Sequence, residues 1–99
     1  MFIQLHPDTL VRDGLTIAPV GENFFFNIDH IGFARFRVST KHDQGGLGAD
    51  ASKVPEGTSC LELSRSALPN DTAQVALYFP GDLVSEYHRL LRILKDQLV

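Results

Sequence analysis

The pattern of apolar and polar positions predicts a series of short β-strands before residue 80. Apolar residues alternate with polar ones over short stretches, and proline, glycine, asparagine and aspartate separate these stretches, as expected for strands joined by turns. The expected strands cover residues 2–5, 10–12, 15–18, 24–28, 33–38, 59–65 and 74–79. Asp13 and Gly14 separate two of them, and this pair suits the tight turn of a β-hairpin. The pattern therefore predicts an antiparallel sheet.

Three consecutive phenylalanines open the most aromatic segment of the chain. Side chains alternate between the two faces of a strand, so Phe24, Phe26 and Ile28 share one face, which we expect to be buried. Phe25 and Asn27 lie on the opposite face. The following polar residues favour a bend, in which an asparagine or aspartate side chain bonds the nearby backbone as in an Asx turn.

The strand at 33–38 has two faces of different character. One face carries an aromatic ring and two guanidinium groups, those of Phe33, Arg35 and Arg37. The other face is mainly apolar and is the better candidate for the core: Ala34, Phe36 and Val38. An aromatic residue between arginines on a sheet can stack a base and contact phosphates.

The segment 83–98 has the periodicity of an amphipathic helix. Its apolar residues fall on one helical face: Leu83, Tyr87, Leu90, Leu91, Leu94 and Leu98. Asp82 precedes them and is the expected N-cap. Strands followed by one helix predict an α+β fold, in which a curved antiparallel sheet of about five or six strands packs against one C-terminal helix.

Composition and charge narrow the class of protein. The 99 residues fit a single domain, and 43% hydrophobic residues are too many for a disordered chain. A net charge of −3 gives no overall positive field to attract nucleic acid or an anionic membrane. The chain starts without the features of a secretory signal, and no apolar run approaches the roughly 20 residues of a membrane span. We expect a cytoplasmic protein that does not contact a membrane.

Few residues suggest catalytic chemistry. The four histidines are scattered, without the spacing of a metal site, and no cofactor is expected. Cys60 is the only cysteine, and we expect a partly exposed structural thiol. Residues 40–58 contain many glycines and predict a long flexible loop. An enzyme using Asp29, His30 or Cys60 beneath this loop is the weakest of the functional alternatives.

The number of apolar residues suggests association with another chain. One helix covers only one face of a sheet, yet phenylalanines occur on both faces of the expected strands. The leading hypothesis is a non-enzymatic binding or adaptor domain that forms a homodimer or contacts another protein. Its interface candidates are Phe24, Phe25, Phe26, Phe33 and Phe36. A curved sheet that closes both faces on one core is the structural alternative, and single-stranded nucleic-acid binding through Phe33, Arg35 and Arg37 is the functional one.

Overall fold

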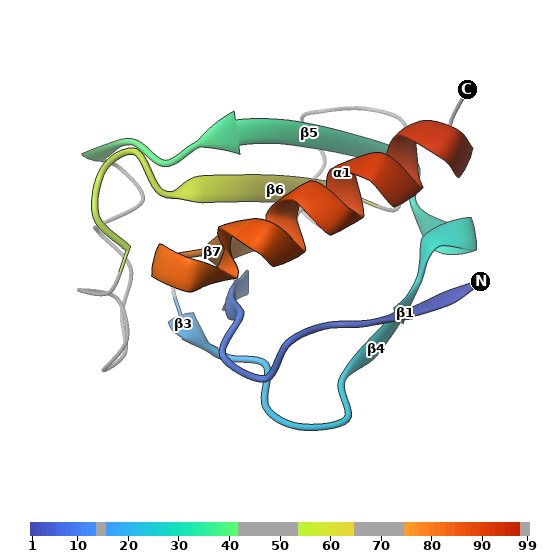
Figure 1. Cartoon of the computed structure of the whole chain (residues 1–99), viewed down its shortest axis with the longest axis horizontal. Coiled ribbons are helices and arrows are strands. Elements are labelled where there is room, and N and C mark those ends of the chain that lie inside the picture. Colours follow the sequence, from blue (N-terminus) through green and yellow to red (C-terminus); the bar gives the residue numbers. More distant parts are fainter. Residues whose placement is uncertain (14–15, 42–53, 65–74, 98–99) are drawn as a thin grey trace.

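Seven strands and one α-helix make up the described part of the chain (Figure 1). The computed structural model describes residues 1–13, 16–41, 54–64 and 75–97. The strands are β1 (Phe2–Gln4), β2 (Leu10–Asp13), β3 (Thr16–Pro19), β4 (Phe25–Asn27), β5 (Phe33–Val38), β6 (Ser59–Ser64) and β7 (Val75–Phe79). Two 3-10 turns, η1 (Ile28–His30) and η4 (Gly81–Leu83), precede β5 and the helix α1 (Val84–Gln97), respectively. The predicted α+β fold is confirmed.

Five strands form the main sheet, which is antiparallel throughout and has the order β3-β2-β7-β6-β5. The predicted hairpin is β2–β3, but Asp13 pairs with Thr16 and therefore belongs to the strand instead of the turn. The β5–β6 pairing continues beyond the strands, because the Ser39 N–H donates to the Thr58 carbonyl over 2.8 Å. Both ends of the predicted flexible loop are thus held by hydrogen bonds, while its residues 42–53 lie outside the described part.

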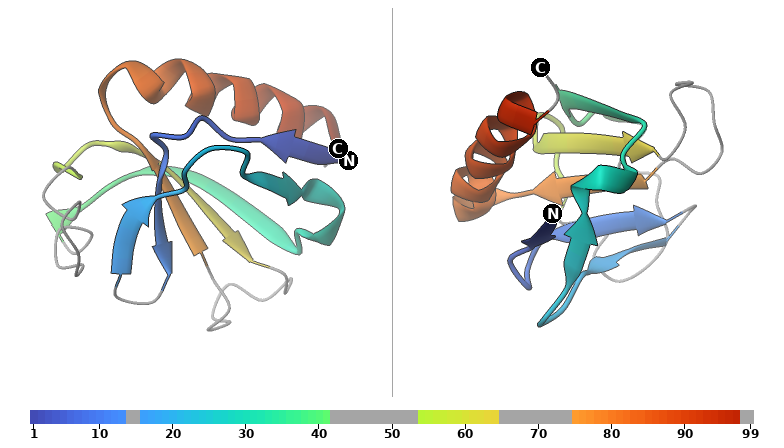
Figure 2. Two further views of the ribbon diagram at one scale, coloured as in Figure 1. Left: turned by 90° about the horizontal axis from the view of Figure 1, so that it is seen from below. Right: turned by 90° about the vertical axis from the view of Figure 1, so that its right-hand side faces the viewer.

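A second, two-stranded sheet pairs β1 with β4, with Ile3 opposite Phe26. The pairing extends at one end, where the Leu5 N–H donates to the Phe24 carbonyl over 3.0 Å. The sequence predicted both strands but not that they pair with each other. This small sheet lies on the same side of the main sheet as α1 (Figure 2), so the helix and the small sheet share the covering of one face.

The main core fills the space between these elements. Buried side chains from every layer meet there: Ile3, Leu5, Ile28, Leu61, Leu77, Phe79, Leu90 and Leu94. Phe36 packs against this core, and its ring meets Tyr87 of α1 edge-on with centroids 5.4 Å apart. Within the described residues, the predicted apolar face of the helix therefore points inward, with Leu90 and Leu94 at its centre, and Leu98 of that face lies outside them.

The start of α1 differs from the prediction that Asp82 is its N-cap. Asp82 lies inside η4, and its backbone carbonyl accepts a hydrogen bond from the Ser85 hydroxyl over 3.3 Å. Pro80 and Gly81 form the tighter turn that delays the α-helix until residue 84. Asp82 therefore lies one residue before Leu83, the position that flanks the first α-helical residue.

The second face of the main sheet is also covered, by a smaller apolar cluster around Cys60. Its members are Leu10, Ile17, Val54, Cys60, Ala76 and Tyr78. The expectation of a partly exposed thiol is wrong, since Cys60 has an exposed fraction of 0%. Leu10, Tyr78 and Cys60 are successive partners across three strands, and Val54 completes the cluster from outside the sheet. Part of the apolar excess is therefore buried within the chain.

Candidate functional site

The outer face of the small sheet exposes two phenylalanines. Ile3 and Phe26 pack toward the main core, so alternation directs their neighbours Phe2 and Phe25 away from it. Phe2 is 69% exposed and Phe25 is 52% exposed. Phe2 pairs with Asn27, and Gln4 pairs with Phe25, which places the two rings diagonally across the ladder and within reach of one another.

We call the outer face formed by Phe2, Gln4, Phe25 and Asn27 the aromatic face. Met1 and Phe24, each next in the chain to one of its phenylalanines, are also exposed. The sequence named Phe24 and Phe25 as interface candidates but did not indicate Phe2. The expectation that Phe24 is buried with Phe26 and Ile28 is wrong, since Phe24 is 39% exposed. The alternation of Phe2, Ile3 and Gln4 could have suggested that Phe2 and Ile3 differ in burial, but it could not say which of them points outward.

The remaining interface candidates are placed differently. Phe26 and Phe36 are partly buried against the main core, so they contribute little to a surface. The Phe33 backbone lies in β5, and its side chain is outside the described part. Among the side chains that the structure describes, the exposed phenylalanines therefore gather on and beside the small sheet.

The two arginines of β5, Arg35 and Arg37, differ in role: one is at the surface and the other forms an ion pair within the fold. Arg37 forms an ion pair through Nε with Oε1 of Glu62, and its Nη1 donates to the Val38 carbonyl over 3.0 Å. Arg35 lies directly opposite Glu62 in the ladder and is exposed. Of these two guanidinium groups, Arg35 is the more accessible to a ligand.

The weak catalytic candidates do not converge. Asn27 Oδ1 accepts the Asp29 N–H over 3.0 Å, which confirms the expected Asx-type bend. The Asp29 carboxylate instead binds the Met1 ammonium group over 2.6 Å. His30 lines a mainly apolar cavity of about 320 Å³ on the α1 side of the sheet, whereas Cys60 is buried on the opposite side. The main sheet therefore separates the thiol from the imidazole.

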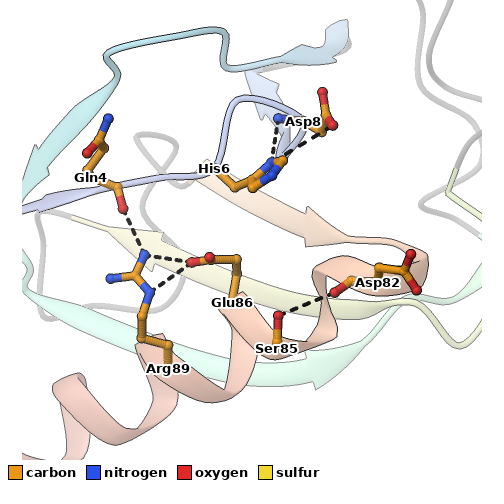
Figure 3. A network of polar contacts seen from close by, with 7 residues as sticks. All are labelled: Gln4, His6, Asp8, Asp82, Ser85, Glu86 and Arg89. Carbon is orange, nitrogen blue, oxygen red and sulfur yellow. Dashed lines mark hydrogen bonds and ion pairs between the residues drawn. The ribbon is translucent and has the colours of Figure 1, made fainter.

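A second cavity, of about 510 Å³, lies at the start of α1 and has a mixed lining of apolar and polar residues, with three carboxylates, from Asp8, Asp82 and Glu86. The contacts beside it tie the helix to β1 (Figure 3). Arg89 donates through Nε to Glu86 over 2.8 Å and through Nη2 to the Gln4 carbonyl over 2.8 Å. Among the residues that the structure describes, no group of three metal-ligating side chains occurs. The contacts of Arg89 with Glu86 and with the Gln4 carbonyl mainly position α1.

Among the described side chains, the aromatic face and Arg35 are the exposed features that the sequence candidates leave at the surface. Within the described ranges, no helix combines the length and the apolar character needed to cross a membrane. Comparison with protein-family models, curated proteins and solved structures finds no match.

Proposed function

We propose that this chain is a small cytoplasmic, non-enzymatic binding domain that acts through protein–protein contact and forms a homodimer through its aromatic face. The observation that carries this proposal is the exposure of Phe2 and Phe25 on a sheet whose other face is packed into the core. Exposed aromatic rings are enriched at protein interfaces, because their burial stabilises association.

The chemistry of the aromatic face favours a second copy of the chain. A twofold axis brings a surface against itself, so any charged side chain on it tends to face a like charge. The four outer positions carry two phenyl rings and two amides, from Gln4 and Asn27. The nearby Met1 ammonium group is already neutralised by Asp29. Self-contact therefore meets no electrostatic penalty at these positions.

The exposed apolar area also suits a dimer of modest size. From the exposed fractions of Phe2 and Phe25, the two rings of the aromatic face expose about 240 Å². A standard interface buries about 800 Å² on each partner, of which a little more than half is apolar. The two rings thus supply about half of the apolar area that such an interface needs.

The test compares two variants by sedimentation over a range of protein concentrations. The wild-type chain is expected to reach twice its 11.0 kDa mass at high micromolar concentration. Phe2→Gln with Phe25→Gln should weaken dimerisation by about 700-fold or more, because the twofold dimer loses four rings and each buried ring contributes at least about 1 kcal/mol. Val38→Gln changes another exposed apolar residue, 58% exposed and on β5, and should leave the dimer intact. A wild-type chain that remains monomeric, or equal weakening in the control, would refute the proposal.

Single-stranded nucleic-acid binding is the second candidate, and the exposed guanidinium of Arg35 supports it. The engagement of Arg37 by Glu62 reduces the charge available on the same strand. Titration of labelled protein with a short oligothymidine at two salt concentrations should then shift the Arg35 resonances in a salt-dependent manner. The absence of such shifts would remove this candidate.

A further inference from the structure

The two edges of the main sheet differ in how they are protected. β3 forms one edge, is four residues long and ends at Pro19, and short strands with proline resist the addition of another strand. β5 forms the other edge, has six residues and contains no proline. Among the described strands, β5 is therefore the better template for an added strand.

The register identifies the backbone groups that β5 presents outward. Bonded and non-bonded pairs alternate along an antiparallel ladder, and Ser39 donates to its opposite residue Thr58 over 2.8 Å. Because the direction repeats at every second residue, the backbone N–H groups of Arg37 and Arg35 point toward β6, as that of Ser39 does. Those of Ala34, Phe36 and Val38 consequently point away from it. The outer edge of β5 thus presents three N–H groups in the spacing that a strand requires.

Basic side chains accompany this edge. The Arg37 guanidinium reaches the edge itself, because its Nη1 donates to the Val38 carbonyl. Arg35 is exposed on the same face, and Lys41 is exposed just beyond the strand. Glu62 is the acidic residue paired with this group of cations, and its side chain is only 12% exposed. The edge therefore favours a partner that carries carboxylates.

The same charges oppose the pairing of β5 with β5 of a second copy. In a twofold antiparallel pairing, opposite residues must point to the same face of the sheet. A register centred on Arg35 places it against Arg35 of the copy, and a register centred on Phe36 places Arg35 against Arg37. Like charges directly opposite each other destabilise a ladder. The edge is consequently suited to a different sequence.

We propose that β5 binds an extended segment of another protein, which adds an antiparallel strand to the main sheet and presents Asp or Glu side chains toward Arg35 and Arg37. Main-chain hydrogen bonds to Ala34, Phe36 and Val38 supply the affinity, and the carboxylates supply the selectivity. This site lies on a different sheet from the aromatic face. Its test therefore does not depend on dimerisation.

The experiment uses two synthetic peptides that alternate valine with either glutamate or lysine, titrated into labelled Phe2→Gln, Phe25→Gln protein and followed by NMR. We expect the glutamate peptide to shift the amides of Ala34, Phe36 and Val38 and to slow their hydrogen exchange. The lysine peptide should bind at least about tenfold more weakly, because it places like charges beside the arginines. Equal binding of both peptides, or shifts outside β5, would overturn the proposal.

Two variants test the assigned geometry. Val38→Pro removes an outward N–H while leaving the β5–β6 ladder bonds in place, so it should weaken the glutamate peptide by about tenfold. Val84→Gln, at an exposed valine of α1 outside this edge, is the control and should bind as the parent does. Arg35→Glu should reduce the preference for the glutamate peptide. Unchanged binding by Val38→Pro, in a protein whose spectrum remains folded, would contradict strand addition at this edge.

Discussion

Removal of Arg37 should destabilise the fold far more than removal of Arg35, although the two residues lie on the same face of one strand. Arg37 contacts Glu62, whereas Arg35 is exposed to solvent. Replacement of Arg37 by methionine retains the packing of the aliphatic stem but leaves the Glu62 carboxylate without its ion-pair partner. The comparison therefore measures the contribution of the contacts that the Arg37 guanidinium makes, which include the ion pair and the hydrogen bond to the Val38 carbonyl.

The burial of the Arg37 and Glu62 side chains determines how much free energy of unfolding is lost when the ion pair is broken. Breaking a fully buried ion pair costs about 3–5 kcal/mol, and breaking an exposed one costs about 0–1 kcal/mol. The Arg37 and Glu62 side chains are 26% and 12% exposed, so the pair lies between these limits. For Arg37→Met we expect a loss of about 2 kcal/mol in the free energy of unfolding. For Arg35→Met the expected loss is below about 0.5 kcal/mol.

A double-mutant cycle with Glu62→Met completes the measurement. Each single variant loses the Arg37–Glu62 interaction, and the double variant loses it only once, so the double variant should lose about 1 kcal/mol less than the sum of the single variants. Urea unfolding followed by circular dichroism is suitable, because the chain has no tryptophan. Equal unfolding midpoints for Arg37→Met and Arg35→Met, or additive losses in the cycle, would refute the structural role of the pair.

Two further predictions concern the contact between α1 and the sheet. Leu94→Ala should reduce the free energy of unfolding by about 3 kcal/mol, because Leu94 is only 1% exposed. Lys95→Ala, at an exposed residue, should reduce it by less than about 0.5 kcal/mol in the same urea unfolding. Similar losses in the two variants would contradict the packing of α1. Burial, with a smaller contribution from Cys60, raises the pKa of Tyr87 above its usual 10.0. The folded state therefore favours the neutral phenol, and this stabilisation is complete below pH 10 and is lost as the pH rises through the folded-state pKa. Tyr87→Phe should reduce the fall in stability above pH 10, and an unchanged fall would contradict this assignment.

Local sequence patterns predicted the elements well because each depends on neighbouring residues. The turn propensity of the Asp13 and Gly14 region indicated the β2–β3 hairpin, and the helical periodicity placed Leu90 and Leu94 on the buried face. The alternation through β4 correctly separated Phe25 from the residues that face the core. Local periodicity thus predicted which side chains of these elements face the core.

Long-range pairing and the second buried face were not predictable in the same way. The partners of β1 lie more than 20 residues away in β4, and no local pattern selects that partner over the main sheet. The burial of Cys60 had a weak signal, since the five residues of β7 are all apolar, as in strands covered on both faces. That signal does not reveal which residues provide the cover. Here Ile17 and Val54 provide it from distant parts of the chain.

The two proposed surfaces are both formed by β-strands, but one permits association with a second copy of the chain and the other opposes it. The aromatic face lacks charged side chains at its outer positions, so a second copy can approach it. The β5 edge carries Arg35 and Arg37, which oppose self-pairing and so reduce the risk that an open edge leads to aggregation. If both proposals hold, each dimer presents two β5 edges. A partner with two acidic segments would then bind both edges at once, and its affinity would rise with the effective concentration that the linker between the segments sets. The Phe2→Gln, Phe25→Gln variant should lose this increase in affinity and retain the affinity for a single segment.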